Sequence, residues 1–189
     1  MGLTRMHDCE EEGQPVSATK SPESAASHLK LGAALLRAQK PEQAKQELGR
    51  ALALDPSSVE GWINLGGARL SCFDFSGCIE ANIKAQQCDP SLLVAHYNQG
   101  LGHLYLGQAE EMVRCFERVV ELDSDHAGGQ YHLAVGLFSM GQIDRARAAL
   151  SRAMELGHAV DPDFLGAIQF EPGETVSALE FGPSNHSVE

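Results

Sequence analysis

The chain has 189 residues, of which 43% are hydrophobic and 21% charged, which fits one ordinary domain and excludes a chain that is disordered throughout. Its formal net charge of -12 at pH 7 argues against nucleic-acid binding, because phosphate contacts need clustered Lys and Arg. No apolar run approaches the roughly 18 residues of a membrane helix, so we expect no membrane insertion.

The first 24 residues are polar and rich in turn-forming residues, as in EEEGQPVSATKSPES. Such a segment buries too little apolar surface to fold alone, so we predict a disordered N-terminal arm over 1–24. Its opening holds HDCEEEG where a secretory signal places its apolar segment, which favours a cytoplasmic protein. Ser24 or Ser27 is expected to cap the first helix.

Residues 25–160 divide into blocks of 34 residues with nothing inserted between them: 25–58, 59–92, 93–126 and 127–160. Apolar and small residues recur within each block at spacings of three and four, which predicts two helices per block. The first helix is marked at its fourth place by His28, Trp62, His96 and Gln130, at its seventh by Leu31, Leu65, Gln99 and Leu133, and at its eighth by Gly32, Gly66, Gly100 and Ala134.

The second helix of each block carries its own pattern. Counted along the block, the twentieth place holds Ala44, Cys78, Met112 and Ala146. The twenty-fourth place holds Leu48, Asn82, Phe116 and Leu150, and the twenty-seventh holds Ala51, Ala85, Val119 and Ala153. We expect Gly or Ala at the eighth place to face small residues of this helix, so that the two backbones approach closely. Each block closes with a helix stop: LDPSS, CDPSL, LDSDH or LGHAV.

This pattern resembles the tetratricopeptide repeat, which carries Trp, Leu-Gly, Tyr, Ala, Phe, Ala and Pro at these offsets in a 34-residue unit. The resemblance implies an all-α fold, a right-handed superhelical solenoid of antiparallel helix pairs. Residues depart from the family pattern at four places: Gln99 replaces Leu, Asn82 replaces an aromatic residue, and Ser124 and His158 replace Pro.

After the repeats, DPDFLGAIQF is predicted to form a short capping helix over 161–170, with Asp161 as N-cap and Pro162 in the first turn. An acidic tail follows over 171–189. It either stays solvated and keeps the array soluble, or folds back on the protein's own groove or on a second copy through four apolar side chains: Phe170, Val176, Leu179 and Phe181.

The resemblance also implies that the first helix of each repeat lines a concave groove. The matching places give these candidate peptide-binding residues: Leu29, Lys30, Ile63, Asn64, Tyr97, Asn98, Leu101, Tyr105, Tyr131, His132 and Val135. Side-chain amides of Asn64 and Asn98 suit the backbone of an extended peptide, but each such bond contributes only about 0.5 to 1.5 kcal/mol. We therefore expect selectivity to come from the three tyrosines, which are all the tyrosines of the chain.

The residues do not favour a catalytic or metal-binding reading. No phosphate loop, nucleophile elbow or zinc motif occurs, and five cysteines without a CxxC pair fit reduced thiols rather than a disulfide framework. His96 and His103 lie two helical turns apart, too far to share a metal without a third ligand. We therefore predict no enzyme activity, no cofactor and no metal site.

Among interaction proteins, one subclass of the family clamps the carboxylate of heat-shock chaperones with Lys, Asn and Arg. The matching places here hold Leu29, Ala33, Asn64, Val94 and Asn98, so that activity is disfavoured. The sequence favours a module that binds a peptide or helix of another protein in its groove, as an adaptor or as an assembly or secretion-type chaperone. The alternative is a self-associating structural scaffold, such as a homodimer.

Overall fold

The computed structural model describes residues 24–169, so most of the arm predicted over 1–24 and the tail predicted over 171–189 lie outside the described residues. Within that range the regular structure is helical throughout. The helices are α1 (Ala25–Arg37), α2 (Pro41–Leu54), α3 (Val59–Ser71), α4 (Phe75–Cys88), α5 (Leu93–Tyr105), α6 (Ala109–Leu122), α7 (Ala127–Ser139), α8 (Ile143–Glu155) and α9 (Pro162–Gln169).

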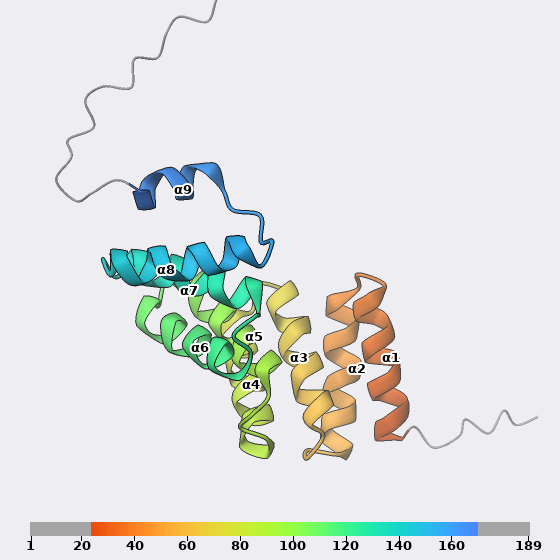
Figure 1. Ribbon diagram of the computed structural model, residues 1–189. Coiled ribbons are helices and arrows are strands. Elements are labelled where there is room, and N and C mark those ends of the chain that lie inside the picture. The colour runs from red at the N-terminus through yellow and green to blue at the C-terminus, as the bar shows by residue number, and fades with distance from the viewer. Residues whose placement is uncertain (1–23, 170–189) are drawn as a thin grey trace, which may run out of the picture.

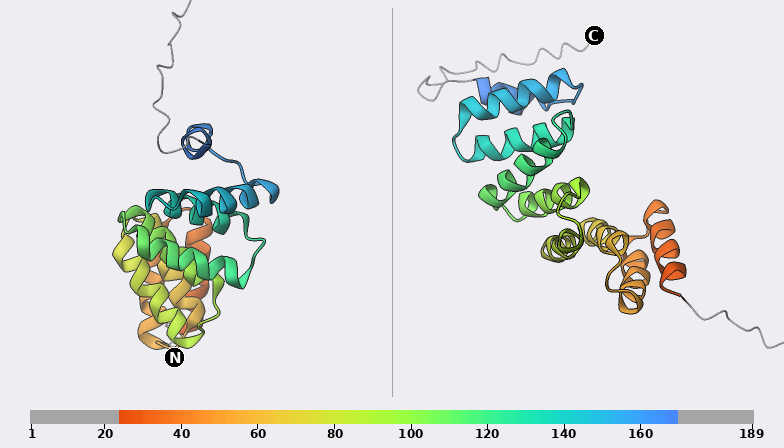
Figure 2. Two further views of the ribbon diagram at one scale, coloured as in Figure 1. Left: turned by 60° about the vertical axis from the view of Figure 1, so that its left-hand side comes forward. Right: turned by 60° about the horizontal axis from the view of Figure 1, so that its bottom comes forward.

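The helices form antiparallel hairpins that stack in chain order (Figure 1), and the described part of the chain is the all-α right-handed superhelix expected from the sequence. Each first helix pairs with the second helix of its own repeat, and each second helix packs on the first helix of the next. The two ends of the array lie far apart (Figure 2). Across residues 24–169 no helix combines the length and apolarity of a membrane span.

The close approach within each hairpin occurs at the eighth place. A Cβ added to the glycine there would overlap the side chain at the twenty-fourth place of the same repeat: Leu48 for Gly32, Asn82 for Gly66 and Phe116 for Gly100. The expectation that this glycine faces small residues is therefore wrong. It is small because the side chain opposite is large.

At the fourth place of the second, third and fourth repeats, Trp, His and Gln side chains make the same hydrogen bond. Each presents an N–H group to the carbonyl oxygen six residues upstream, in the turn that joins it to the preceding repeat. The bonds are Trp62 Nε1 to Pro56 at 2.8 Å, His96 Nε2 to Pro90 at 3.0 Å and Gln130 Nε2 to Ser124 at 3.1 Å. In the second, third and fourth repeats, this place therefore holds a donor that fixes the inter-repeat turn.

The apolar core consists of two clusters. One joins buried residues of the first two repeats, and the other joins those of the last two repeats and α9. Between the clusters stand two buried polar side chains, Asn82 on α4 and Gln99 on α5. Asn82 Nδ2 donates to the carbonyl of Cys78 at 2.8 Å, and Gln99 Nε2 donates to Gln86 Oε1 at 3.3 Å. Two departures from the family pattern thus meet at the junction of the second and third repeats.

Helix α9 closes the second cluster. Ile168 is fully buried, and the Phe164 ring lies edge-on to Tyr131 and Phe138, with centroids 5.9 and 5.5 Å away. Asp161 Oδ1 accepts the backbone N–H of Asp163 at 2.8 Å at the start of the helix. This short helix covers the apolar surface that the last repeat would otherwise expose.

Arg147 on α8 holds the other end of α9. Its Nε donates to the Ile168 carbonyl at 2.8 Å, and one terminal nitrogen donates to the Gln169 carbonyl at 3.1 Å. Hydrogen bonds from a charged donor contribute about 1.5 to 3 kcal/mol. We expect Arg147→Ala to speed amide exchange over residues 162–169 by about tenfold or more, measured by mass spectrometry.

The matched control is Arg118→Ala, which removes an exposed arginine whose partner, Glu121, is one turn away at 2.9 Å. Exposed pairs of this kind contribute little. Equal exchange of α9 in the two variants would mean that Arg147 is not what holds the helix.

Candidate functional site

The sixth, ninth and thirteenth places of the first helices share one face of α1, α3, α5 and α7, because they are three and four residues apart. We call this surface the groove face. Its residues are Lys30, Ala33, Arg37, Asn64, Gly67, Ser71, Asn98, Leu101, Tyr105, His132, Val135 and Ser139. None is acidic, although the chain has 26 acidic residues. Lys30 and Arg37 are exposed and form no ion pair with another described residue.

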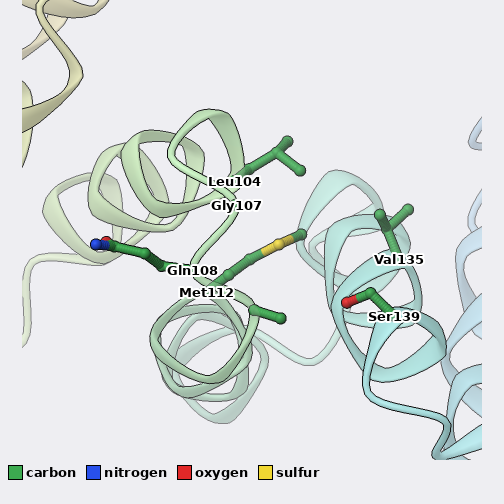
Figure 3. Close-up of a pocket in the computed structure, with 7 residues that line it drawn as sticks. Leu104, Gly107, Gln108, Met112, Val135 and Ser139 are labelled. Atoms are coloured by element: carbon green, nitrogen blue, oxygen red, sulfur yellow. The ribbon is translucent and has the colours of Figure 1, made fainter.

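The groove face is hollowed between successive repeats. The central pocket, of about 280 Å³, lies between the α3–α4 hairpin and α5 and is lined by Leu70, Ser71, Phe73, Phe75, Leu101 and Tyr105. The distal pocket, of about 310 Å³, lies between the α5–α6 hairpin and α7 (Figure 3) and is lined by Leu104, Gly107, Gln108, Ala109, Met112, Val135 and Ser139. The two pockets are uncharged and occupy equivalent places of neighbouring repeats.

An exposed aromatic cluster forms the wall of the central pocket. Phe75 stacks on Tyr105 with centroids 4.7 Å apart and planes 12° apart, and Phe73 meets Phe75 edge-on at 6.2 Å. Phe73 is 79% exposed and Tyr105 60% exposed. Large aromatic surface open to solvent is what binding sites of interaction proteins present.

Phe73 also has an unfavourable backbone conformation, with a φ of 60°. The equivalent places of the third and fourth repeats hold Gly107 and Gly141, which adopt a φ of 69° and 72° without a Cβ penalty. A bulky side chain at this φ costs about 1 to 2 kcal/mol. The equivalent place of the first repeat also holds a residue with a side chain, Gln39 at a φ of 56°, and Phe73 differs from it in exposing a large aromatic ring. Sequence reasoning missed Phe73 and Phe75, and the signal was Phe where two repeats have Gly.

Tyr97 and Tyr131 lie between repeats instead of lining the pockets. The Tyr97 ring lies 5.6 Å from Phe116 and 5.0 Å from His126, and burial raises the pKa of its hydroxyl. The Tyr131 ring lies 4.5 Å from His158. Both are half-buried and pack against the second core cluster.

His132 lies among these rings, 5.0 Å from Phe116 and nearly parallel to it, and 5.8 Å from Tyr97. Burial, and secondarily the positive charges of His158 and His126 when protonated, lower its pKa to about 4. Its buried Nδ1 has no hydrogen-bond partner among the described residues. His132 is therefore uncharged at neutral pH.

The other candidate residues divide between the core and the groove face. Leu29 and Ile63 are half-buried, and Leu29 packs on the first core cluster. Asn64 is half-buried, whereas Asn98 Nδ2 donates to Asn82 Oδ1 at 3.4 Å. The structure brings Leu101 and Tyr105 together in the central pocket and places Val135 in the distal one.

Two cysteine thiols are poor nucleophiles because burial raises their pKa. Burial raises the pKa of Cys78 and of Cys115 to about 11, so both stay protonated at neutral pH. Cys88 is exposed. Within residues 24–169 no group of three or more His, Cys, Asp or Glu residues is arranged to hold a metal ion.

Comparison with known proteins gives a consistent family match. Two family models described as tetratricopeptide repeat match residues 25–68 and 97–160. No curated protein matches the chain.

Solved structures of similar shape include MamA, at 21% identity and a TM-score of 0.69, covering 71% of this chain and 79% of that one. Residues 41 to the end of MamA from Desulfovibrio magneticus RS-1 match at 21% identity and a TM-score of 0.67, covering 70% and 75%. Pseudomonas aeruginosa pilF matches at 21% identity and a TM-score of 0.67, covering 74% of this chain and 64% of its own. At these identities the likeness concerns the fold.

Proposed function

Because the chain belongs to the tetratricopeptide repeat family, a non-catalytic protein-interaction fold, we propose that it binds an extended peptide or short helix of a cytoplasmic partner protein along the groove face. Its role would be that of an adaptor or an assembly chaperone. The observation that carries the proposal is the pair of uncharged pockets at equivalent places of successive repeats.

The repeat of the pockets suits a linear ligand. Helices α3 and α5 contact each other, and packed helices lie about 8 to 10 Å apart. An extended chain rises about 3.3 Å per residue. Side chains two or three residues apart in a bound peptide therefore fit successive pockets.

The pockets also supply apolar surface that side chains of a ligand can cover. Burial of one Leu, Val or Phe side chain contributes about 1.5 to 3 kcal/mol. The aromatic wall of the central pocket adds contact at low entropic cost, since Phe75 and Tyr105 already stack on each other. We therefore place the anchor of the interaction at the central pocket.

Self-association through the second helices is the competing proposal. Exposed apolar side chains do occur there, as Leu54 on α2, Ile83 on α4 and Met154 on α8. They stand on three different helices, and single exposed apolar residues are ordinary on protein surfaces. The aromatic cluster of the central pocket favours a ligand there.

Replacement of Tyr105 and Phe73 together by alanine in the full chain is expected to lower partner capture about tenfold or more. Both side chains are exposed, so the fold should persist, which circular dichroism checks. Partners captured by the tagged chain are quantified by mass spectrometry, and the affinity of a recovered partner is then measured by calorimetry. Ile83→Ala is the matched control, since it removes an exposed apolar side chain on α4 outside both pockets. Undiminished capture by the double variant would contradict partner binding along the groove face.

A further inference from the structure

The groove face has a charge unlike that of the whole protein. It carries Lys30 and Arg37 and no acidic residue, in a chain with a formal net charge of -12. Arg37 and Ser71 occupy the same row in neighbouring repeats, and Ser71 lines the central pocket. An acidic segment is attracted to this face, because it carries cations and no acidic side chain.

The chain itself contains a segment with that chemistry. Residues 170–189 read FEPGETVSALEFGPSNHSVE, with four acidic residues and no Lys or Arg. Three apolar side chains, Val176, Leu179 and Phe181, fall within six residues of one another. The segment thus offers apolar groups for two pockets, and its negative charge matches a face that carries Lys30 and Arg37 and no acidic residue.

The end of the described chain is close enough for this segment to reach the groove face. Phe164 of α9 packs on Phe138 of α7, and the same helix α7 lines the distal pocket with Val135 and Ser139. The stretch from Gln169 to Val176 spans up to about 23 Å when extended. That length exceeds the roughly 10 to 12 Å diameter of one helix.

The central pocket is one repeat further on. The stretch from Val176 to Phe181 adds up to about 17 Å, which exceeds the 8 to 10 Å between packed helices. One continuous segment is therefore long enough to span both pockets.

We propose that residues 170–181 bind in cis to the groove face, with Val176, Leu179 and Phe181 supplying the side chains that enter the distal and central pockets. This inference rests on the proposed function, because it uses the same pockets. A tethered segment is present at an effective concentration on the order of millimolar. It excludes weak ligands and yields only to a partner segment that binds more tightly, so the tail acts as an internal competitor.

The test uses the full chain and a fluorescently labelled synthetic peptide with the sequence of residues 170–189. Wild type is compared with Leu179→Ser combined with Phe181→Ser, and peptide affinity is measured by fluorescence anisotropy. We expect the variant to bind the peptide at least about tenfold more tightly, because its own tail no longer fills the pockets. Val188→Ser is the matched control, since it removes an apolar side chain of the tail outside the proposed segment, and it should behave as wild type.

Equal affinity of wild type and variant, or no binding to either, would overturn the inference. A wild type that is dimeric by light scattering, with a monomeric variant, would also overturn it, because the occupant would then be a second copy. Failure here is distinguishable from failure of the proposed function. If the Tyr105 and Phe73 double variant loses partner capture while the tail substitutions change nothing, partner binding along the groove face is supported. Only the binding of residues 170–181 in cis is then refuted.

Discussion

Replacement of Phe116 by alanine is expected to lower the free energy of unfolding by about 3 to 5 kcal/mol. Phe116 on α6 is fully buried and is the largest fully buried side chain among the described residues. Its ring lies under Gly100 and contacts Tyr97 and His132, so it joins both helices of the third repeat to the fourth. Its removal leaves a cavity that the close backbone of α5 cannot fill.

Chemical denaturation followed by circular dichroism measures this change, and Phe73→Ala is the control of the same residue type. Phe73 is 79% exposed, so its loss should change stability by no more than about 0.5 kcal/mol. Phe73→Gly should stabilise the protein by about 1 kcal/mol, because glycine accepts a φ of 60° without strain. A loss below about 1 kcal/mol for Phe116→Ala would show that the site collapses and that the third repeat does not depend on it.

The helices were predictable because their signals are local and repeat four times. Small residues at the eighth place and Pro, Gly or Asp at the block ends recur every 34 residues, and α1, α3, α5 and α7 begin at that interval. A single helical pattern is ambiguous, whereas a repeated one restricts the fold to a stack of hairpins.

The contacts made by the residues of each row were less predictable, since those contacts depend on packing between residues far apart in the sequence. The sequence showed Gln99 and Asn82 as departures but not that Gln99 bonds to Gln86 and Asn98 to Asn82 at one junction. It also showed a row of small residues at the eighth place without showing that Phe116 stands opposite Gly100. Periodicity tells which face a residue is on, and volume and hydrogen-bond partners decide what it meets there.

The candidate site was likewise predictable only in part. Row membership placed Leu101, Tyr105 and Val135 on the groove face, and the structure adds pockets around them. The same reasoning treated Tyr97 and Tyr131 alike, yet the Tyr97 ring packs on His126 at the start of α7 and the Tyr131 ring packs on Phe164 of the cap. The periodic pattern that located the rows gives no information about the size of these neighbours, His126 and Phe164.

Acid is expected to destabilise the fold through His132, which is the second large effect. Burial lowers its pKa from the ordinary 6.5 to about 4. Between these values the unfolded chain binds a proton that the folded chain does not. The contribution of this group is therefore complete above about pH 6.5 and is lost as the pH falls toward 4. At 1.36 kcal/mol per pKa unit, the interval from 6.5 to about 4 corresponds to a full loss of about 3 to 4 kcal/mol.

Denaturation midpoints of wild type and His132→Leu, measured from pH 7.5 to 4, check this expectation. Leucine fills similar space and breaks no bond of Nδ1, since that atom has no hydrogen-bond partner among the described residues. The variant should lose most of the acid-dependent decline between pH 6.5 and 4, while His103→Gln, at a ring bonded to Gln108 outside this cluster, should keep it. Parallel pH profiles of wild type and His132→Leu would mean that the proton is taken up elsewhere, and that the ring cluster around Phe116 tolerates a charged imidazole.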